Sequence, residues 1–135
     1  RARAARSELL TLAEEDATAF TAFMDALKLP KNSESERAAR TAALSTAAQR
    51  AAEVPLATLR ATVAVAEAAK SITDRSLASA ESDLAVAARF ARAGGESAAE
   101  NVEANLPFIE GAEIRATLAH QTEAALIALR RATPQ

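Results

Sequence analysis

The sequence has no cysteine, tryptophan or tyrosine, and only one histidine among its 135 residues. Without cysteine the chain forms no disulfide and performs no thiolate chemistry. A lone histidine with no paired ligand spacing speaks against a zinc site. The net charge of −2 and the missing stacking residues speak against nucleic acid. We therefore expect neither a metal site nor a nucleic-acid partner.

Long apolar runs are also missing. No run approaches the roughly 18–20 residues that span a bilayer, and no signal peptide is recognisable. We expect a cytoplasmic protein without membrane contact. The chain has no initiating Met and begins inside a predicted helix, which is typical of a fragment, a processed product or an otherwise incomplete chain.

Glycine and proline are scarce, at 3 and 4 residues, whereas roughly three residues in ten are alanine. Alanine is the best helix former, and the chain has few of the aromatic and β-branched residues that favour strands. The composition predicts an all-α, alanine-rich bundle. The motifs below divide it into five or six helices, in one domain that covers residues 1–135.

The first helix is expected over residues 4–28 and ends before Pro30, which disfavours the helical conformation at the preceding residue. Asp16 interrupts its apolar face. That face is expected to point into the bundle and consists of Leu9, Leu12, Ala13, Phe20, Phe23, Met24 and Leu27.

A capping box, with Ser33 as N-cap and Glu36 reaching back, predicts a second helix that ends near Glu53. Pro55 suits the first turn of a third helix, which runs to about Arg75. This third helix has apolar residues on two sides, as expected of a helix at the centre of a bundle.

The C-terminal half is expected to break at residues 74–82, where Ser79 or Ser82 is the next N-cap. Gly94-Gly95 is interpreted as a C-cap and Pro107 as a helix end. Gly111 marks the last break. The three remaining helices are expected over residues 83–93, from residue 96 to Pro107, and over 112–132.

Two acidic residues stand on faces that should be buried. Burying Asp16 is costly unless it is paired, and a structural ion pair with Arg37 or Arg40 explains it as well as a functional role does. Asp83 lies near a helix start, where the helix dipole alone can account for a carboxylate.

Two asparagines share a helix face. Asn101 and Asn105 are one turn apart, and asparagine is a poor residue inside a helix. Either hydrogen bonding between helices or ligand binding explains them. Lys31 follows a helix end, where a lysine is usually only solvated. Alone, these residues support no more than a helical domain with a polar pocket.

The order of short motifs is more specific. The chain contains, in succession, Asp16-x-x-Ala19-Phe20, Leu29-Pro30-Lys31, the cap from Ser33 to Arg40, Val54-Pro55-Leu56, Ser82-Asp83 and Asn101-Val102-x-x-Asn105-Leu106. Over roughly residues 6–110 this series resembles the cyclodeaminase/cyclohydrolase family. That family includes the C-terminal domain of formiminotransferase-cyclodeaminase and the stand-alone methenyltetrahydrofolate cyclohydrolases.

The resemblance implies a helical homodimer that acts on a tetrahydrofolate substrate without a metal or other cofactor. It also implies catalytic roles for Asp16 and Asp83. The substrate-binding residues it implies are Lys31, Arg37, Arg40, Ser82, Asn101 and Asn105. The reaction that the resemblance implies is hydrolysis of 5,10-methenyltetrahydrofolate or cyclodeamination of 5-formiminotetrahydrofolate.

Two departures support an alternative. Family members carry a glycine- and serine-rich stretch and a long helix before the point where this chain starts, so we expect the domain to be N-terminally incomplete. They also commonly have Gly-Asn where this chain has Ser76-Leu77. The alternative is a non-catalytic, degenerate relative that serves as a dimeric helical scaffold or interaction module.

Overall fold

The computed structural model describes residues 2–73 and 77–133. Its described residues form helices joined by short turns, which confirms the all-α prediction. Four long helices replace the expected five or six. They are α1 (Ala2–Leu27), α2 (Glu34–Thr73), α3 (Glu81–Asn105) and α4 (Ala112–Ala132), with short 3₁₀ turns η1 (Ala78–Ala80) and η2 (Leu106–Phe108).

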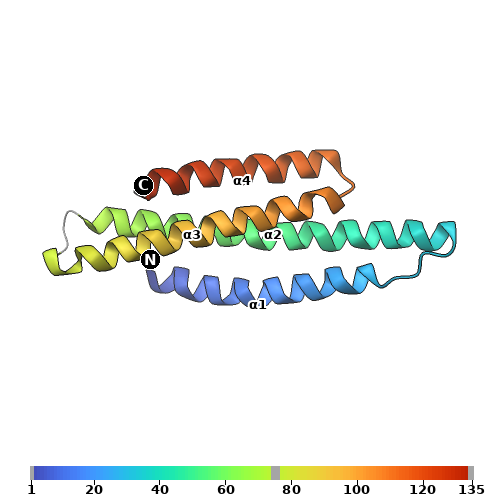
Figure 1. Cartoon of the computed structure of the whole chain (residues 1–135), viewed down its shortest axis with the longest axis horizontal. Helices are drawn as coiled ribbons and strands as arrows, with labels where there is room; N and C mark the ends of the chain where they lie inside the picture. The colour runs from blue at the N-terminus through green and yellow to red at the C-terminus, as the bar shows by residue number, and fades with distance from the viewer. Residues whose placement is uncertain (1, 74–76, 134–135) are drawn as a thin grey trace.

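Successive helices run antiparallel, and α1 and α4 lie on opposite sides of the α2–α3 pair (Figure 1). α2 packs against all three other helices, which confirms that the segment after Pro55 is central. Within the described residues, the backbone of α1 approaches only α2, whereas α4 packs on both α2 and α3. One flank of α1 therefore lacks a helix neighbour.

The expected helix break near Glu53 is wrong, because α2 continues through Pro55. Proline has no N–H, so it leaves the carbonyl one turn earlier, that of Ala51, without its usual donor. The Asn105 side chain supplies one: its Nδ2 donates to the Ala51 carbonyl oxygen at 3.1 Å. A side chain from α3 thus compensates for the proline, and two predicted helices merge into one.

The Gly94-Gly95 break is also wrong, since both residues lie inside α3. A Cβ at Gly95 would lie 2.5 Å from both Leu129 Cδ2 and Thr62 Oγ1. Gly95 is therefore needed where α3 packs closely on α2 and α4, and it is not a helix end. A Cβ at Gly94 would make only an ordinary van der Waals contact, with Thr62 Cγ2 at 3.8 Å.

These two glycines give a matched stability prediction. Gly94→Ala should stabilise the fold by about 0.5–1 kcal/mol, because alanine is the better helix residue. Gly95→Ala should destabilise it by about 1 kcal/mol, because overpacking outweighs the same helix gain. Urea unfolding of both variants measures the difference. Equal shifts for the two would contradict the close packing at Gly95.

Most predicted helix ends are confirmed. Ser33 and Glu36 form the capping box: the Glu36 N–H donates to Ser33 Oγ at 3.1 Å, and the Ser33 N–H donates to Glu36 Oε2 at 3.0 Å. α3 ends before Pro107, and α4 spans the expected 112–132. The expected Ser79 or Ser82 cap is wrong, because Ala80 occupies the N-cap without a side-chain hydrogen bond.

Small side chains build much of the core between α2, α3 and α4. Leu59 and Leu129 are fully buried there, among alanines of all three helices. α1 buries only a narrow stripe at seven-residue intervals, made of Ala5, Leu12, Ala19 and Ala26. The rest of its predicted apolar face is less covered, and Phe20 is 62% exposed. None of the described helices is both long and apolar enough to cross a membrane.

Candidate functional site

A groove runs between α1 and α3, with α2 as its floor. It consists of two adjoining pockets that share Asp16, Pro55 and Asn101. The first, of 110 Å³, is called here the aromatic pocket and is also lined by Phe20, Phe23, Ala51 and Asn105. The second, of 210 Å³, is called the larger pocket; its other lining residues are Leu9, Leu12, Ala13, Thr58, Gly94, Ser97 and Ala98.

Asp16 stands where the two pockets meet. The expectation that α1 buries this carboxylate in the bundle is wrong: Asp16 is exposed, because α1 is covered only on its α2 side. The alternative of an ion pair with Arg37 or Arg40 is also wrong, since both arginines bond backbone carbonyls elsewhere. Within the described residues the Asp16 carboxylate has no ion-pair partner, so it is available to a ligand.

The two asparagines play different parts in this wall of the groove. Asn105 Nδ2 donates to Ala51 O and, at 2.8 Å, to Asn101 O, so its amide group is engaged in the fold. For Asn105 the structure thus supports hydrogen bonding between helices, one of the two alternatives that the sequence left open. Asn101 is exposed and lines both pockets together with Asp16. Of the two amides, that of Asn101 is the better placed to meet a ligand.

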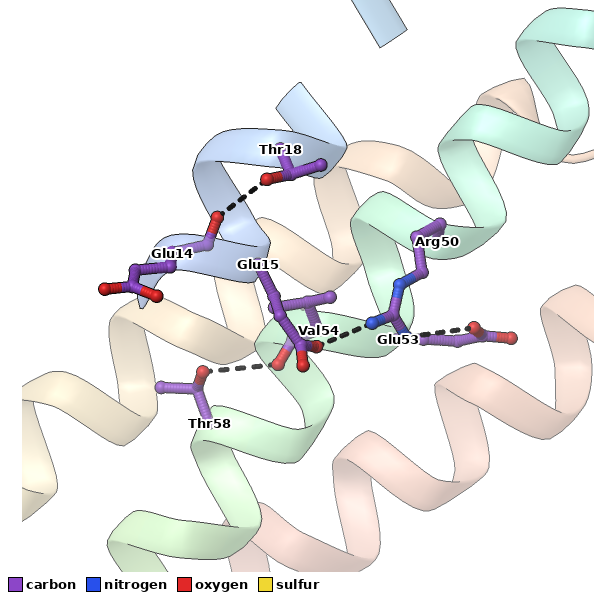
Figure 2. A network of polar contacts seen from close by, with 7 residues as sticks. All are labelled: Glu14, Glu15, Thr18, Arg50, Glu53, Val54 and Thr58. Atoms are coloured by element: carbon purple, nitrogen blue, oxygen red, sulfur yellow. Dashed lines mark hydrogen bonds and ion pairs between the residues drawn. The ribbon is translucent and has the colours of Figure 1, made fainter. Parts of the chain in front are cut away.

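One ion pair among the polar contacts drawn in Figure 2 joins α1 to α2. Arg50 Nη2 contacts Glu15 Oε2 at 2.6 Å, and its Nη1 lies 3.9 Å from Glu53 Oε2. In the next turn of α2, the Thr58 hydroxyl donates to the Val54 carbonyl at 3.2 Å. Because Glu15 precedes Asp16, the ion pair with Arg50 helps to fix the helix turn that carries Asp16.

The three predicted cations gather at the turn between α1 and α2. Arg40 donates from Nε and Nη2 to the carbonyl of Leu27, the last residue of α1, at 3.3 and 3.2 Å. Arg37 Nη1 donates to the Lys31 and Asn32 carbonyls at 3.4 and 3.3 Å. Both arginines thus bond local backbone carbonyls; Lys31 and Arg37 are exposed, and Arg40 is half-buried. This cluster lies beyond the aromatic end of the groove.

Ser82 and Asp83 lie elsewhere. Both are exposed in the first turn of α3. Asp83 precedes Asn101 by five helical turns, a rise of about 27 Å along the helix axis at 1.5 Å per residue. Within one chain, the structure therefore brings Asp16, Asn101 and Asn105 together but leaves Ser82 and Asp83 apart from them. Ser76 lies outside the described residues, and Leu77 is 79% exposed.

The family model described as formiminotransferase-cyclodeaminase matches residues 1–124. The chain belongs to the formiminotransferase-cyclodeaminase family. The match confirms the family resemblance drawn from the short motifs and extends past both of its limits, residues 6 and 110.

The chain is 39% identical over 100 residues to the methenyltetrahydrofolate cyclohydrolase of Methylorubrum extorquens. That alignment covers 74% of this chain and 48% of the bacterial protein. The chain is 38% and 37% identical over 103 residues to the formimidoyltransferase-cyclodeaminases of Rattus norvegicus and Mus musculus. Those alignments cover 76% of this chain and 19% of each mammalian protein. The chain thus spans about half of the bacterial relative and about a fifth of the mammalian ones.

Sequence reasoning missed several groove residues of this family member. Phe20 was assigned to the core, yet it lines the aromatic pocket and is 62% exposed. Ser97 and Thr58 carry no motif and become visible only when α2 and α3 are placed beside α1. Pro55 was the one sequence signal that could have indicated where α3 packs on α2, because a proline inside a helix leaves a carbonyl that needs another donor.

The described residues give no sign of a metal centre, because none of their His, Asp and Glu side chains gather in groups of three or more that fit an ion. The chemistry available in the groove is that of one carboxylate, one free amide, two hydroxyls and an aromatic wall. Such a set can position a flat, polar molecule and exchange protons with it.

Proposed function

We propose that the protein carrying this chain acts on the one-carbon bridge of tetrahydrofolate. The observation that carries the proposal is the Asp16 carboxylate, which has no ion-pair partner among the described residues and faces a groove together with Asn101. Relatives 37–39% identical to this chain are named for a cyclohydrolase and a cyclodeaminase. The reaction is either hydrolysis of 5,10-methenyltetrahydrofolate to 10-formyltetrahydrofolate or ring closure of 5-formiminotetrahydrofolate with loss of ammonia. We propose that the protein is cytoplasmic.

Both reactions pass through a tetrahedral carbon bonded to N5 and N10, so both need protons moved to and from nitrogen or oxygen. Asp16 can accept a proton from the attacking water in hydrolysis, or from N10 in ring closure, and return it to the leaving nitrogen. Its negative charge also stabilises the cationic bridge. Asn101 holds the water or the pterin edge through its amide. Neither step requires a metal or another cofactor.

The proposal includes a homodimer. Asp83, Val86 and Phe90 follow one another at spacings of three and four on α3, so they share a helix face. Val86 is 45% and Phe90 75% exposed, which is a large apolar surface to leave in water. A second chain covers this face, and Ser82 and Asp83 act on the substrate held by the partner, because in one chain they are too far from Asp16.

The dimer face gives a prediction with a direct readout. Phe90→Arg should convert the dimer to monomers at micromolar concentration, because it places a charge in an apolar contact. The fold should remain intact, since Phe90 is already mostly exposed in one chain. Sedimentation equilibrium measures the change. As a control, Ile127→Arg alters an exposed residue of α4 and should leave the dimer unchanged. A wild-type protein that is strictly monomeric would remove this part of the proposal.

The cation cluster predicts a preference for folates with longer glutamate tails. Arg37 and Arg40 bond backbone carbonyls, whereas the exposed Lys31 side chain has no such bond among the described residues. Lys31→Ala should therefore reduce that preference by about 3-fold, as expected of one exposed charge pair. The ratio of KM for mono- and triglutamyl substrates measures it. Lys28→Ala is the control, because Lys28 is paired with Asp25 at 2.9 Å. An unchanged ratio in Lys31→Ala would exclude contact between this cluster and the tail.

The alternative function is non-catalytic, with the chain as a dimeric scaffold or interaction module. The exposed Phe90 and Val86 fit that reading as well. Steady-state assays of the natural protein with each of the two folate substrates separate the candidates. Turnover of one substrate supports the enzyme and identifies the reaction. A folded natural protein that turns over neither substrate supports the scaffold.

A further inference from the structure

The two pockets follow one another along the groove in a fixed order. Going towards the C-terminal end of α1, the larger pocket comes first, then Asp16 at the junction, then the aromatic pocket with Phe20 and Phe23. The turn that carries Lys31 lies beyond. The groove therefore presents four different chemical environments in a line: the larger pocket, the Asp16 carboxylate, the aromatic pocket and the basic turn.

A reduced folate is also linear. Its bicyclic pterin is joined through the N5–N10 region to a p-aminobenzoyl ring, which carries the glutamate tail. Resting on the proposed function, we infer that the substrate lies lengthwise in the groove in one orientation. The pterin occupies the larger pocket, the one-carbon bridge faces Asp16, the p-aminobenzoyl ring packs on Phe20, and the tail points to Lys31.

The larger pocket matches the pterin in size and polarity. It has 210 Å³ against 110 Å³ for its neighbour, and the pterin is the larger of the two ring systems. Thr58, Ser97 and Asn101 offer it hydroxyl and amide groups. Thr58 already donates to Val54 O, so its oxygen remains an acceptor for a ring N–H. Gly94 contributes no side chain and keeps this pocket open.

The aromatic pocket matches a single benzene ring. Phe20 is 62% exposed one turn after Asp16, on the same side of α1. Beside it, Phe23 is held by an edge-to-face contact with Phe108, with ring centroids 5.1 Å apart. Aromatic pairs in such geometries are favourable beyond their buried area. An exposed phenylalanine beside a fixed one is therefore a suitable wall for a flat ring.

Polarity at the two ends decides between this orientation and its reverse. The reverse would send the anionic tail along Leu9 and Leu12 of α1, where the larger pocket has no cation. The chosen orientation sends it towards Lys31, Arg37 and Arg40. The bridge lies beside Asp16 in either orientation, because the carboxylate lines both pockets, so the position of the anionic tail decides.

The test compares three ligands on the natural protein: a reduced folate, p-aminobenzoylglutamate and a tetrahydropterin without the benzoyl ring. Phe20→Leu should weaken binding of the first two by about 10-fold, in line with losses on removing a stacking ring. It should change binding of the tetrahydropterin by less than 2-fold. Met24→Leu, one turn further along α1 and outside both pockets, is the control and should change none of the three.

A second readout uses the absence of Trp and Tyr in this chain. Phe20→Trp introduces a fluorophore whose emission p-aminobenzoylglutamate should change, whereas Ile127→Trp on α4 should not respond. Where the rest of the natural protein carries other tryptophans, the difference from wild type gives the same signal. The Trp variant also shows that position 20 is folded and reachable.

The outcomes are separable. Loss of tetrahydropterin affinity in Phe20→Leu, with p-aminobenzoylglutamate unaffected, would overturn the orientation in favour of its reverse. Unchanged affinity for all three ligands would remove Phe20 from the site while leaving the proposed function intact. A weaker dimer with unchanged folate affinity would assign Phe20 to the subunit contact. Failure of the wild-type protein to bind any folate would instead overturn the proposed function itself.

Discussion

Asp16→Asn should lower turnover of the natural protein by about 100-fold or more while leaving its free energy of unfolding nearly unchanged. The loss follows from removing the group proposed to transfer protons at the one-carbon bridge. The stability should hold because the Asp16 carboxylate is exposed and has no ion-pair partner among the described residues. Steady-state rates and thermal melts of the same preparation measure both quantities.

Asp25→Asn is the matched control for this experiment. Asp25 is another exposed carboxylate of α1, it pairs with Lys28 rather than facing the groove, and its loss should leave turnover unchanged. Near-normal turnover in Asp16→Asn would show that the carboxylate is not catalytic. A stability loss of about 1–3 kcal/mol in that variant would instead assign Asp16 a structural hydrogen bond.

Asn105→Ala should cost about 2 kcal/mol of stability. The substitution leaves the Ala51 carbonyl without a donor, because Pro55 cannot supply one. In a Pro55→Ala background the backbone N–H returns, so the same Asn105→Ala change should cost about 1 kcal/mol or less. Urea unfolding of the two single variants and the double variant completes the cycle.

The coupling free energy between positions 105 and 55 decides whether Asn105 compensates for the missing N–H of Pro55. An interaction of about 1 kcal/mol or more would confirm that Asn105 compensates for the proline. Additive effects would show that Asn105 stabilises α3 on its own, through its bond to Asn101 O. In that case the continuity of α2 through Pro55 would need another explanation.

Local signals in the sequence predicted the helix ends that depend on local chemistry. The Ser33–Glu36 capping box, the stop before Pro107 and the span of α4 are set by residues within one or two turns. Pro55 and Gly95 were misjudged because what decides them comes from distant residues. Asn105 lies 54 positions after Ala51, whose carbonyl it bonds. Position 95 requires a glycine because Thr62 and Leu129 leave no room for a Cβ.

The candidate site was predictable only in part, because local patterns indicate polar residues but not which helices lie beside them. Asp16 was singled out as an acid on an apolar face, and Asn101 and Asn105 as two asparagines on one helix face; all three do line one pocket. The reason given for Asp16, burial, was wrong, because periodicity shows which residues share a face but not whether a neighbour covers it. Phe20 was missed for that reason too. The separation of Asp83 from Asp16 follows from α3 being one unbroken helix, which the glycine pair concealed.

The most direct test of the account is a calorimetric titration of the natural protein with a reduced folate, with and without Ala13→Phe. Ala13 is exposed and lines the larger pocket, so a phenylalanine there should fill the groove without disturbing the core. The account predicts saturable binding by the unaltered protein and at least about 10-fold weaker binding by the variant. Equal affinity of the two, or no binding by the unaltered protein, would contradict it.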